Sequence, residues 1–97
     1  MTAYVFIRIK ADDPSQLKDY QQLAPSIIDK YNGKILARGG EVATLEGPEE
    51  KRRIVIIEFS NLADAKQFYH SEEYKRAIEL RKNVADFEII AVDGVNY

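Results

Sequence analysis

The run Ile54-Val55-Ile56-Ile57-Glu58-Phe59 is the most hydrophobic stretch of the chain and is rich in β-branched residues. Such residues favour β-strands, and an almost unbroken apolar run is typical of a central strand that is buried on both faces. Glu58 is the one charged residue in the run. The stretch therefore predicts a central β-strand that carries one embedded carboxylate.

A charged segment just upstream connects this strand to an earlier one. Glu46-Gly47-Pro48-Glu49-Glu50-Lys51 has the composition of a hairpin turn, and Lys34 to Arg38 predicts the strand on its other side. Gly39 and Gly40 interrupt that strand before Glu41 to Leu45. Glycines inside a strand are typical of a bend or a bulge, so we expect the strand to bend there and to continue.

The N-terminal part of the chain predicts a strand followed by a helix. Apolar and other residues alternate over 3–10, which indicates a strand with one fully apolar face. Asp12-Asp13-Pro14 places capping carboxylates before a proline at the first helical position, and Asn32-Gly33 ends the helix. Pro25 lies inside the apolar stripe of this helix and is expected to kink or break it near Ala24.

The segment after the central strand predicts a two-part helix and a last strand. Ser60-Asn61 provides a cap, and the apolar residues that follow have helical spacing. His70-Ser71 interrupts the helix, and Ser71 with Glu72 and Glu73 restarts it. Alternation from Asp86 to Val92 indicates the last strand.

The order β-α-β-β-α-β is that of the α+β ferredoxin-like fold, which has a four-stranded antiparallel sheet. We expect the first and third strands to lie parallel at its centre, with both helices on the same face. The other face would then expose an apolar patch larger than monomers usually show, formed by Tyr4, Phe6, Ile54 and Ile56. A second copy of the chain would cover this patch, so we predict a homodimer through the sheet face.

The composition narrows the class of protein. A chain of 97 residues fits one domain, here 1–97, and 45% hydrophobic with 31% charged residues is typical of a soluble globular protein. No apolar run is long enough for a membrane helix, and the N-terminus lacks the features of a signal peptide, so we expect a cytoplasmic protein with no membrane partner.

The charges and the metal-binding residue types exclude further classes. A net charge of −2 argues against a nucleic-acid partner, and the basic run Lys51-Arg52-Arg53 is expected to be a solvated loop. The chain has no cysteine and a single histidine, so we expect no metal site. No phosphate loop or dinucleotide fingerprint is present, and no cofactor is expected.

Several motifs follow one another between about Tyr4 and Gly94: Tyr31-Asn-Gly-Lys-Ile-Leu-Ala-Arg-Gly-Gly-Glu-Val, the Leu45-Glu-Gly turn, Ile56-Ile-Glu-Phe, Phe68-Tyr-His-Ser-Glu-Glu-Tyr and Ile78-Glu-Leu-Arg. In this order they resemble the bacterial domain of unknown function 1330 (DUF1330) family. The resemblance implies a dimeric α/β-barrel, in which two ferredoxin-like subunits face each other across their sheets. That superfamily includes cofactor-free oxygenases, haem-degrading enzymes and chlorite-dismutase-like proteins, whereas the family itself has no assigned activity.

Arg38 is the leading candidate for ligand binding. It precedes Gly39 and Gly40, which allow close approach of a ligand, and a guanidinium presents a planar fork of donors suited to a carboxylate or phosphate. The alternative is that the glycines form only a strand bulge and that Arg38 pairs with an acid such as Glu58. Arg81, on the apolar stripe of the last helix, either binds an anion or complements the helix C-terminus.

Three other residues complete the candidate set. Glu58 is either an ion-pair partner or a carboxylate with a raised pKa that acts as a base. His70, at the helix break, is either a general base or an exposed residue without an orienting partner. Tyr69 is expected either in the core or on the lining of a pocket.

Two functions follow from these alternatives. The first is a site for a small anionic molecule between helices and sheet, in a binding module or a cofactor-independent enzyme. The second is a non-catalytic dimeric domain whose embedded charges satisfy one another. The residues identify no reaction type, and a closed Arg38–Glu58 pair without a cavity would exclude the ligand hypothesis.

Overall fold

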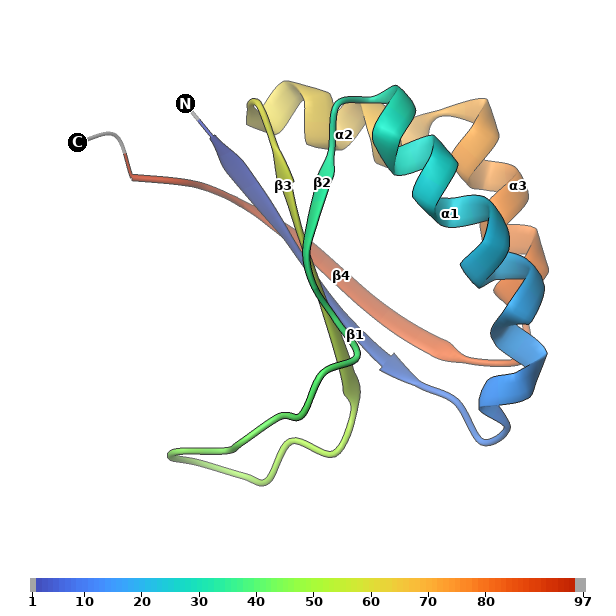
Figure 1. Ribbon diagram of the computed structural model, residues 1–97, viewed down its shortest axis with the longest axis vertical. Helices are drawn as coiled ribbons and strands as arrows, with labels where there is room; N and C mark the ends of the chain where they lie inside the picture. Colours follow the sequence, from blue (N-terminus) through green and yellow to red (C-terminus); the bar gives the residue numbers. More distant parts are fainter. Residues whose placement is uncertain (1, 96–97) are drawn as a thin grey trace.

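The structure is a computed structural model that describes residues 2–95; residues 1, 96 and 97 of the expected 1–97 domain lie outside the described part. Four strands and three α-helices follow one another in the order expected for a ferredoxin-like fold, which confirms that prediction (Figure 1). The elements are β1 (Ala3–Lys10), the 3-10 helix η1 (Pro14–Leu17), α1 (Lys18–Lys30), β2 (Lys34–Arg38), β3 (Arg53–Phe59), α2 (Leu62–His70), α3 (Glu72–Arg81) and β4 (Asp86–Asp93).

The strands form one sheet in the order β2-β3-β1-β4, and every neighbouring pair is antiparallel. The expectation that the first and third strands lie parallel is therefore wrong. The crossover through α1 makes β1 and β2 run in the same direction. Because β3 forms hydrogen bonds with both of them from the position between, it runs opposite to both.

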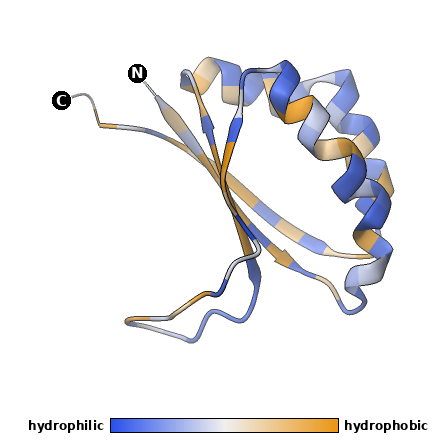
Figure 2. Ribbon diagram, viewed as in Figure 1, coloured by the Kyte–Doolittle hydropathy of each residue, from blue (hydrophilic) through white to orange (hydrophobic). Residues whose placement is uncertain are grey.

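All the helices lie on one side of the sheet (Figure 1). In β1 and β3, buried residues on the helix face alternate with half-buried residues on the other, open face. The prediction that β3 is buried on both faces is thus wrong for the single chain, because no element within residues 2–95 covers the open face. Figure 2 shows hydrophobic segments along the strands, while the helices carry mixed hydrophobic and hydrophilic residues.

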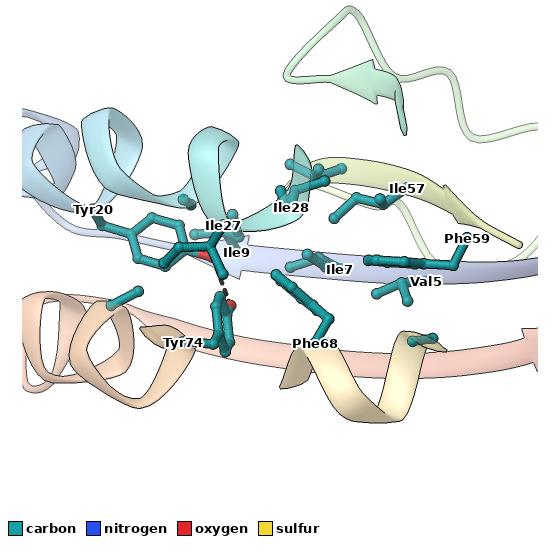
Figure 3. Close-up of a cluster of buried hydrophobic side chains, with 14 of the residues drawn as sticks. Val5, Ile7, Ile9, Tyr20, Ile27, Ile28, Ile57, Phe59, Phe68 and Tyr74 are labelled. Atoms are coloured by element: carbon teal, nitrogen blue, oxygen red, sulfur yellow. Dashed lines mark hydrogen bonds between the residues drawn. The ribbon is translucent and has the colours of Figure 1, made fainter. Parts of the chain in front are cut away.

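Aromatic side chains fill the core between the helices and the sheet (Figure 3). The Phe68 ring lies 5.2 Å from the Phe59 ring and 4.5 Å from the Tyr74 ring, and all three side chains are fully buried. Ser71 separates α2 from α3, as predicted. Its Oγ accepts a hydrogen bond from the Tyr74 N–H at 3.1 Å and donates one to the Phe68 carbonyl at 2.7 Å. The break therefore holds Phe68 and Tyr74 against each other.

The first helical region begins at the predicted cap. Asp13 accepts hydrogen bonds from the Ser15 N–H and hydroxyl, and the chain passes from η1 directly into α1. The helix then runs unbroken through Pro25, so the expected break does not occur. A proline removes one helix hydrogen bond, and the buried stripe of α1 on the sheet offsets that loss.

Candidate functional site

A cavity of about 330 Å³ lies between α1 and the helix face of the sheet. Its walls are mostly apolar, and its polar side chains are Tyr20, Gln21, Arg38 and Arg53. The apolar lining residues are Ile7, Ile9, Val55 and Ile57 from the two central strands, Ile35 from β2, and Leu17, Ala24, Pro25 and Ile28 from the helical layer. This arrangement suits an apolar molecule with an anionic group.

A β-bulge in β2 directs Arg38 toward this cavity. Ile35 pairs with Ile57, but Ala37 pairs with the adjacent Ile56. Leu36 is therefore the extra residue of the bulge. Arg38 therefore pairs with the buried Val55 and lies on the helix face. Without the bulge, strict alternation would place Arg38 on the open face, as it does Lys34.

The bend expected at the two glycines thus begins earlier, at Leu36, and the strand does not continue past the glycines. β2 ends at Arg38, and residues 39–52 form a loop, so the predicted strand over Glu41 to Leu45 is wrong. Gly39 has a φ of +67°, a left-handed conformation that turns the chain out of the sheet. Its N–H still donates to the Ile54 carbonyl at 3.0 Å, which fixes the start of the turn.

Arg53 is the second cation of the cavity. It begins β3 and pairs with the buried Ile9, so it lies on the helix face. Its guanidinium packs on Gly39, where an added Cβ would lie 2.7 Å from the Arg53 Cζ. Gly39 therefore gives Arg53 the space that it occupies. Arg53 was missed among the basic residues of the expected solvated loop, although the apolar alternation Val55, Ile57, Phe59 extends back to it.

Neither guanidinium is neutralised by a carboxylate of the described residues. Within residues 2–95, Arg38 and Arg53 form no ion pair with a carboxylate. Glu58 pairs with Lys34 and Tyr4 in the sheet register and lies on the open face, opposite to Arg38. The closed Arg38–Glu58 pair that would have excluded a ligand is therefore absent from this part of the chain.

A second hollow of about 630 Å³ adjoins the cavity and shares Ile9, Leu17, Gln21 and Arg53 with it. Gly39, Gly40 and Val42 line it from the loop. We call the first space the inner cavity and the second the outer hollow. The two predicted glycines thus border the outer hollow, next to the guanidinium of Arg53.

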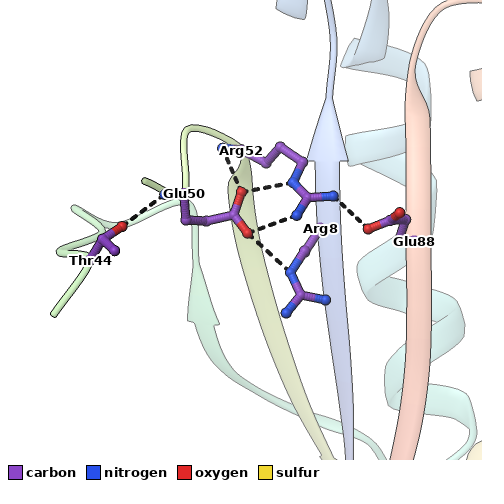
Figure 4. Close-up of polar contacts among 5 residues, drawn as sticks. All are labelled: Arg8, Thr44, Glu50, Arg52 and Glu88. Carbon is purple, nitrogen blue, oxygen red and sulfur yellow. Dashed lines mark hydrogen bonds and ion pairs between the residues drawn. The ribbon is translucent and has the colours of Figure 1, made fainter. Parts of the chain in front are cut away.

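A network of charges holds the 39–52 loop to the sheet (Figure 4). Glu50 accepts hydrogen bonds from Arg8 Nε at 3.1 Å and from Arg52 Nε at 2.7 Å, and its N–H donates to Thr44 Oγ1 at 2.8 Å. Arg52 also pairs with Glu88 of β4. The hydrogen bonds from Arg52, with a contribution from Arg8, lower the pKa of Glu50 to about 2. Arg52 is therefore engaged by protein carboxylates, in contrast to Arg53.

Arg81 lies behind the wall of the inner cavity, with 9% of its surface exposed. Its Cζ is 3.8 Å from the centre of the Phe87 ring and 5.7 Å from that of Tyr20. Its Nε is buried and has no hydrogen-bond partner within the described residues. The hydroxyls of Tyr20 and Tyr74 are 2.7 Å apart, and burial raises the pKa of Tyr20 above its usual value, so that this phenol stays protonated.

Tyr69 and His70, the remaining candidates, do not line the inner cavity. Tyr69 and His70 line a separate hollow of about 170 Å³ between α2 and β4, where their rings lie 5.2 Å apart. Both side chains are exposed. In residues 2–95, no three His, Cys, Asp or Glu side chains gather so as to hold a metal ion. No helix in the same range is long and apolar enough to cross a membrane.

A model of the domain of unknown function DUF1330 matches residues 2–95. The chain belongs to the DUF1330 family. No curated protein sequence matches it. This DUF1330 chain resembles, in structure, a protein of unknown function from Rhodopseudomonas palustris, with a TM-score of 0.75 and 16% identity over 99% of this chain and 84% of the other.

Two further structures have the same fold as this DUF1330 chain. One is a dimeric ferredoxin-like protein of unknown function from Jannaschia sp. CCS1, with a TM-score of 0.75 and 8% identity over 97% of this chain and 100% of the other. The other is SnoaB, a cofactor-independent oxygenase from Streptomyces nogalater, with a TM-score of 0.69 and 6% identity over 99% and 95% of the two chains. Identities this low show the shared fold alone.

Proposed function

We propose that this DUF1330 protein binds a small organic acid, with the apolar body of the acid in the inner cavity and its carboxylate at Arg38 and Arg53. The observation that carries the proposal is the pair of guanidinium groups without a carboxylate partner in residues 2–95, both lining a mostly apolar cavity. A carboxylate matches the planar donor fork of arginine, and the cavity of about 330 Å³ is of a size that small ligands occupy.

The alternative, a non-catalytic domain whose charges satisfy one another, accounts for a different part of the molecule. Glu50, Arg8, Arg52 and Glu88 form a closed network of that kind. Arg38 and Arg53 take no part in it, although Arg53 adjoins Arg52 in the chain. This selective pairing favours a ligand at the inner cavity over a purely structural role for its arginines.

Catalysis is a separate question from binding. SnoaB, which shares the fold, is named a cofactor-independent oxygenase. Of the candidate bases, Glu58 lies on the open face and His70 is the last residue of α2, and neither lines the inner cavity. Tyr20 and Gln21 are the uncharged polar side chains that line it. We therefore propose binding as the function, and oxygen uptake in the presence of a bound acid tests for turnover.

The experiment for binding is a thermal-shift and calorimetric titration with octanoate and benzoate. A ligand at 100 times its dissociation constant stabilises the native state by about 2.7 kcal/mol, which is readily detected. Arg38→Ala should weaken binding by about tenfold, because a hydrogen bond to a charged group contributes about 1.5 kcal/mol at such a site. Arg76→Ala, which removes an exposed cation of α3, is the matched control. Equal affinities of the two variants, or no binding by the native protein, would contradict the proposal.

We also propose that a second copy of the chain covers the open face of the sheet. A row of apolar side chains crosses all four strands there, because Phe6 pairs with both Ile56 and Ile90 and Ile56 pairs with Ala37. Ile90 and Val92 are 58% and 56% exposed in the single chain. The Jannaschia protein of the same fold is described as dimeric, which supports this assembly.

Light scattering coupled to size exclusion tests the dimer. The native protein should elute with twice the mass of the chain, and Ile56→Glu should convert it to a monomer, because a sheet-to-sheet contact would bury an unpaired charge. Ala63→Glu on the exposed side of α2 adds the same charge away from the sheet and should leave the dimer intact. A native monomer at micromolar concentration would refute the proposal.

A further inference from the structure

The inner cavity adjoins the outer hollow at Arg53. Its wall there, formed by Ile9, Leu17, Gln21 and Arg53, is also the wall of the outer hollow, so the two spaces are adjacent along the same side chains. The outer hollow is the larger, at about 630 Å³ against about 330 Å³. A molecule that fills the inner cavity and extends past Arg53 therefore enters the outer hollow.

The two spaces differ in chemistry. The inner cavity is lined mostly by aliphatic side chains, and Arg38 and Arg53 are its only charged ones among the described residues. The outer hollow is lined by four cations, Lys10, Lys51, Arg52 and Arg53, and by one carboxylate, that of Glu50. The outer hollow is thus the more strongly cationic of the two.

The single carboxylate does not neutralise these cations evenly. Glu50 accepts hydrogen bonds from Arg52 and Arg8, and the pKa lowered to about 2 keeps it ionised and engaged with them. Within residues 2–95, neither Lys51 nor Arg53 forms an ion pair. Lys10 forms no ion pair within these residues either, but it faces Asp86 in the register of β1 and β4 and borders a smaller hollow that Asp12 and Asp86 also line, so two carboxylates lie on its side. The positive charge left over is centred on Lys51 and Arg53.

We propose that the ligand is a dicarboxylic acid with an apolar middle. One carboxylate lies at Arg38, the hydrocarbon part occupies the inner cavity, and the second carboxylate extends past Arg53 into the outer hollow, toward Lys51. This inference rests on the proposed function, since it needs the inner cavity to bind an acid, and it adds the second charge. A monocarboxylic acid would leave the unpaired cations of the outer hollow without a partner.

The test compares acids of matched length, octanoate against suberate and decanoate against sebacate, by calorimetry with the native protein. The diacid of the preferred length should bind about fivefold more tightly than its monoacid, because partly exposed ion pairs contribute up to about 1 kcal/mol. Lys51→Ala should remove most of that difference without changing the affinity for the monoacid, and Lys10→Ala should remove less of it. Lys66→Ala, an exposed cation of α2, is the charge-matched control and should change neither affinity.

Two outcomes separate this inference from the proposed function. Monoacids that bind through Arg38, with diacids no tighter at any length, would overturn the dicarboxylate while leaving the acid site in place. Equal weakening of monoacid and diacid by Lys51→Ala would also overturn it, because the lysine would then act only through general attraction of anions. Failure of both kinds of acid to bind would refute the proposed function itself.

Discussion

Replacement of Gly39 by alanine tests how the loop positions Arg53. Gly39 has a φ of +67°, and a left-handed conformation costs a residue with a side chain about 1–2 kcal/mol. The new Cβ would also lie 2.7 Å from the Arg53 Cζ, so the guanidinium must move. Because the end of an arginine side chain is flexible, this movement adds little to the cost in stability but displaces one of the two cations at the inner cavity.

Gly39→Ala should therefore lower the melting temperature by about 5–15 °C, since 1 kcal/mol corresponds to about 4–8 °C in a domain of this size. It should also weaken octanoate binding about as much as Arg53→Ala does. Circular dichroism gives the first quantity and calorimetry the second.

The chain provides its own control in the adjacent glycine. Gly40 has no positive φ, and an added Cβ would meet no atom within 4 Å. Gly40→Ala should therefore change stability by less than about 0.5 kcal/mol and leave the affinity unaltered. In the double variant with Arg53→Ala, Gly39→Ala should still lower the melting temperature but should weaken binding no further. Equal melting temperatures for the two alanine variants would refute this reasoning.

Three further changes test other contacts. The pKa of Glu50 is lowered from 4.5 to about 2, so its ion pairs stabilise the native state above about pH 4.5 and that contribution is lost as the pH falls toward 2. Glu50→Gln should therefore remove this part of the acid dependence of stability in urea titrations, and it should speed proteolysis of the 39–52 loop at neutral pH. An unchanged pH profile of stability would count against the network. Tyr74→Phe should cost about 1–2 kcal/mol, because the buried Tyr20 hydroxyl loses its partner at 2.7 Å, and a loss below 0.5 kcal/mol in urea unfolding would show that water replaces it. Ser71→Ala should cost about 1 kcal/mol in the same assay through loss of the α3 cap, whereas Ser71→Asp should retain most of the stability.

The order of the elements could be predicted because each carries its own periodicity. Alternation in Ala3–Lys10 and the capping residues Asp13 and Ser71 are local signals, and local contacts decide them. The direction of β3 relative to β1, in contrast, depends on how β1, β2 and β3 pair, which the sequence of a single strand does not show. The predicted strand over Glu41 to Leu45 fails for a similar reason, since a strand needs a partner and the left-handed turn at Gly39 leads this segment away from β3.

In the candidate site, too, local sequence signals indicate some residues, whereas strand pairing and packing decide the direction of others. A cation beside two glycines was enough to indicate Arg38, but its direction depends on the bulge at Leu36, which only the pairing with β3 shows. Arg53 could have been found by extending the alternation of Val55, Ile57 and Phe59 backward by one step. Tyr69 and His70 lie at the end of α2 and Arg81 at the end of α3, and only the packing shows that the first two border a different hollow and that Arg81 is covered by aromatic rings.

The extra residue in β2 makes the direction of Arg38 depend on how the strand pairs with β3 rather than on the side chain at the bulge. Leu36 is 47% exposed, so many side chains would fit at its position. Deletion of Leu36 would restore simple alternation and leave Arg38 opposite Val55 on the helix face, because Ala37 would still pair with Ile56. Regular pairing of Leu36 with Ile56, by contrast, would turn Arg38 to the face where we place the second copy of the chain and put its charge into an apolar contact. A homologue with β2 shorter by one residue can therefore keep its acid-binding cation on the helix face, and an alignment that does not place the gap at Leu36 would pair Arg38 with the wrong residue.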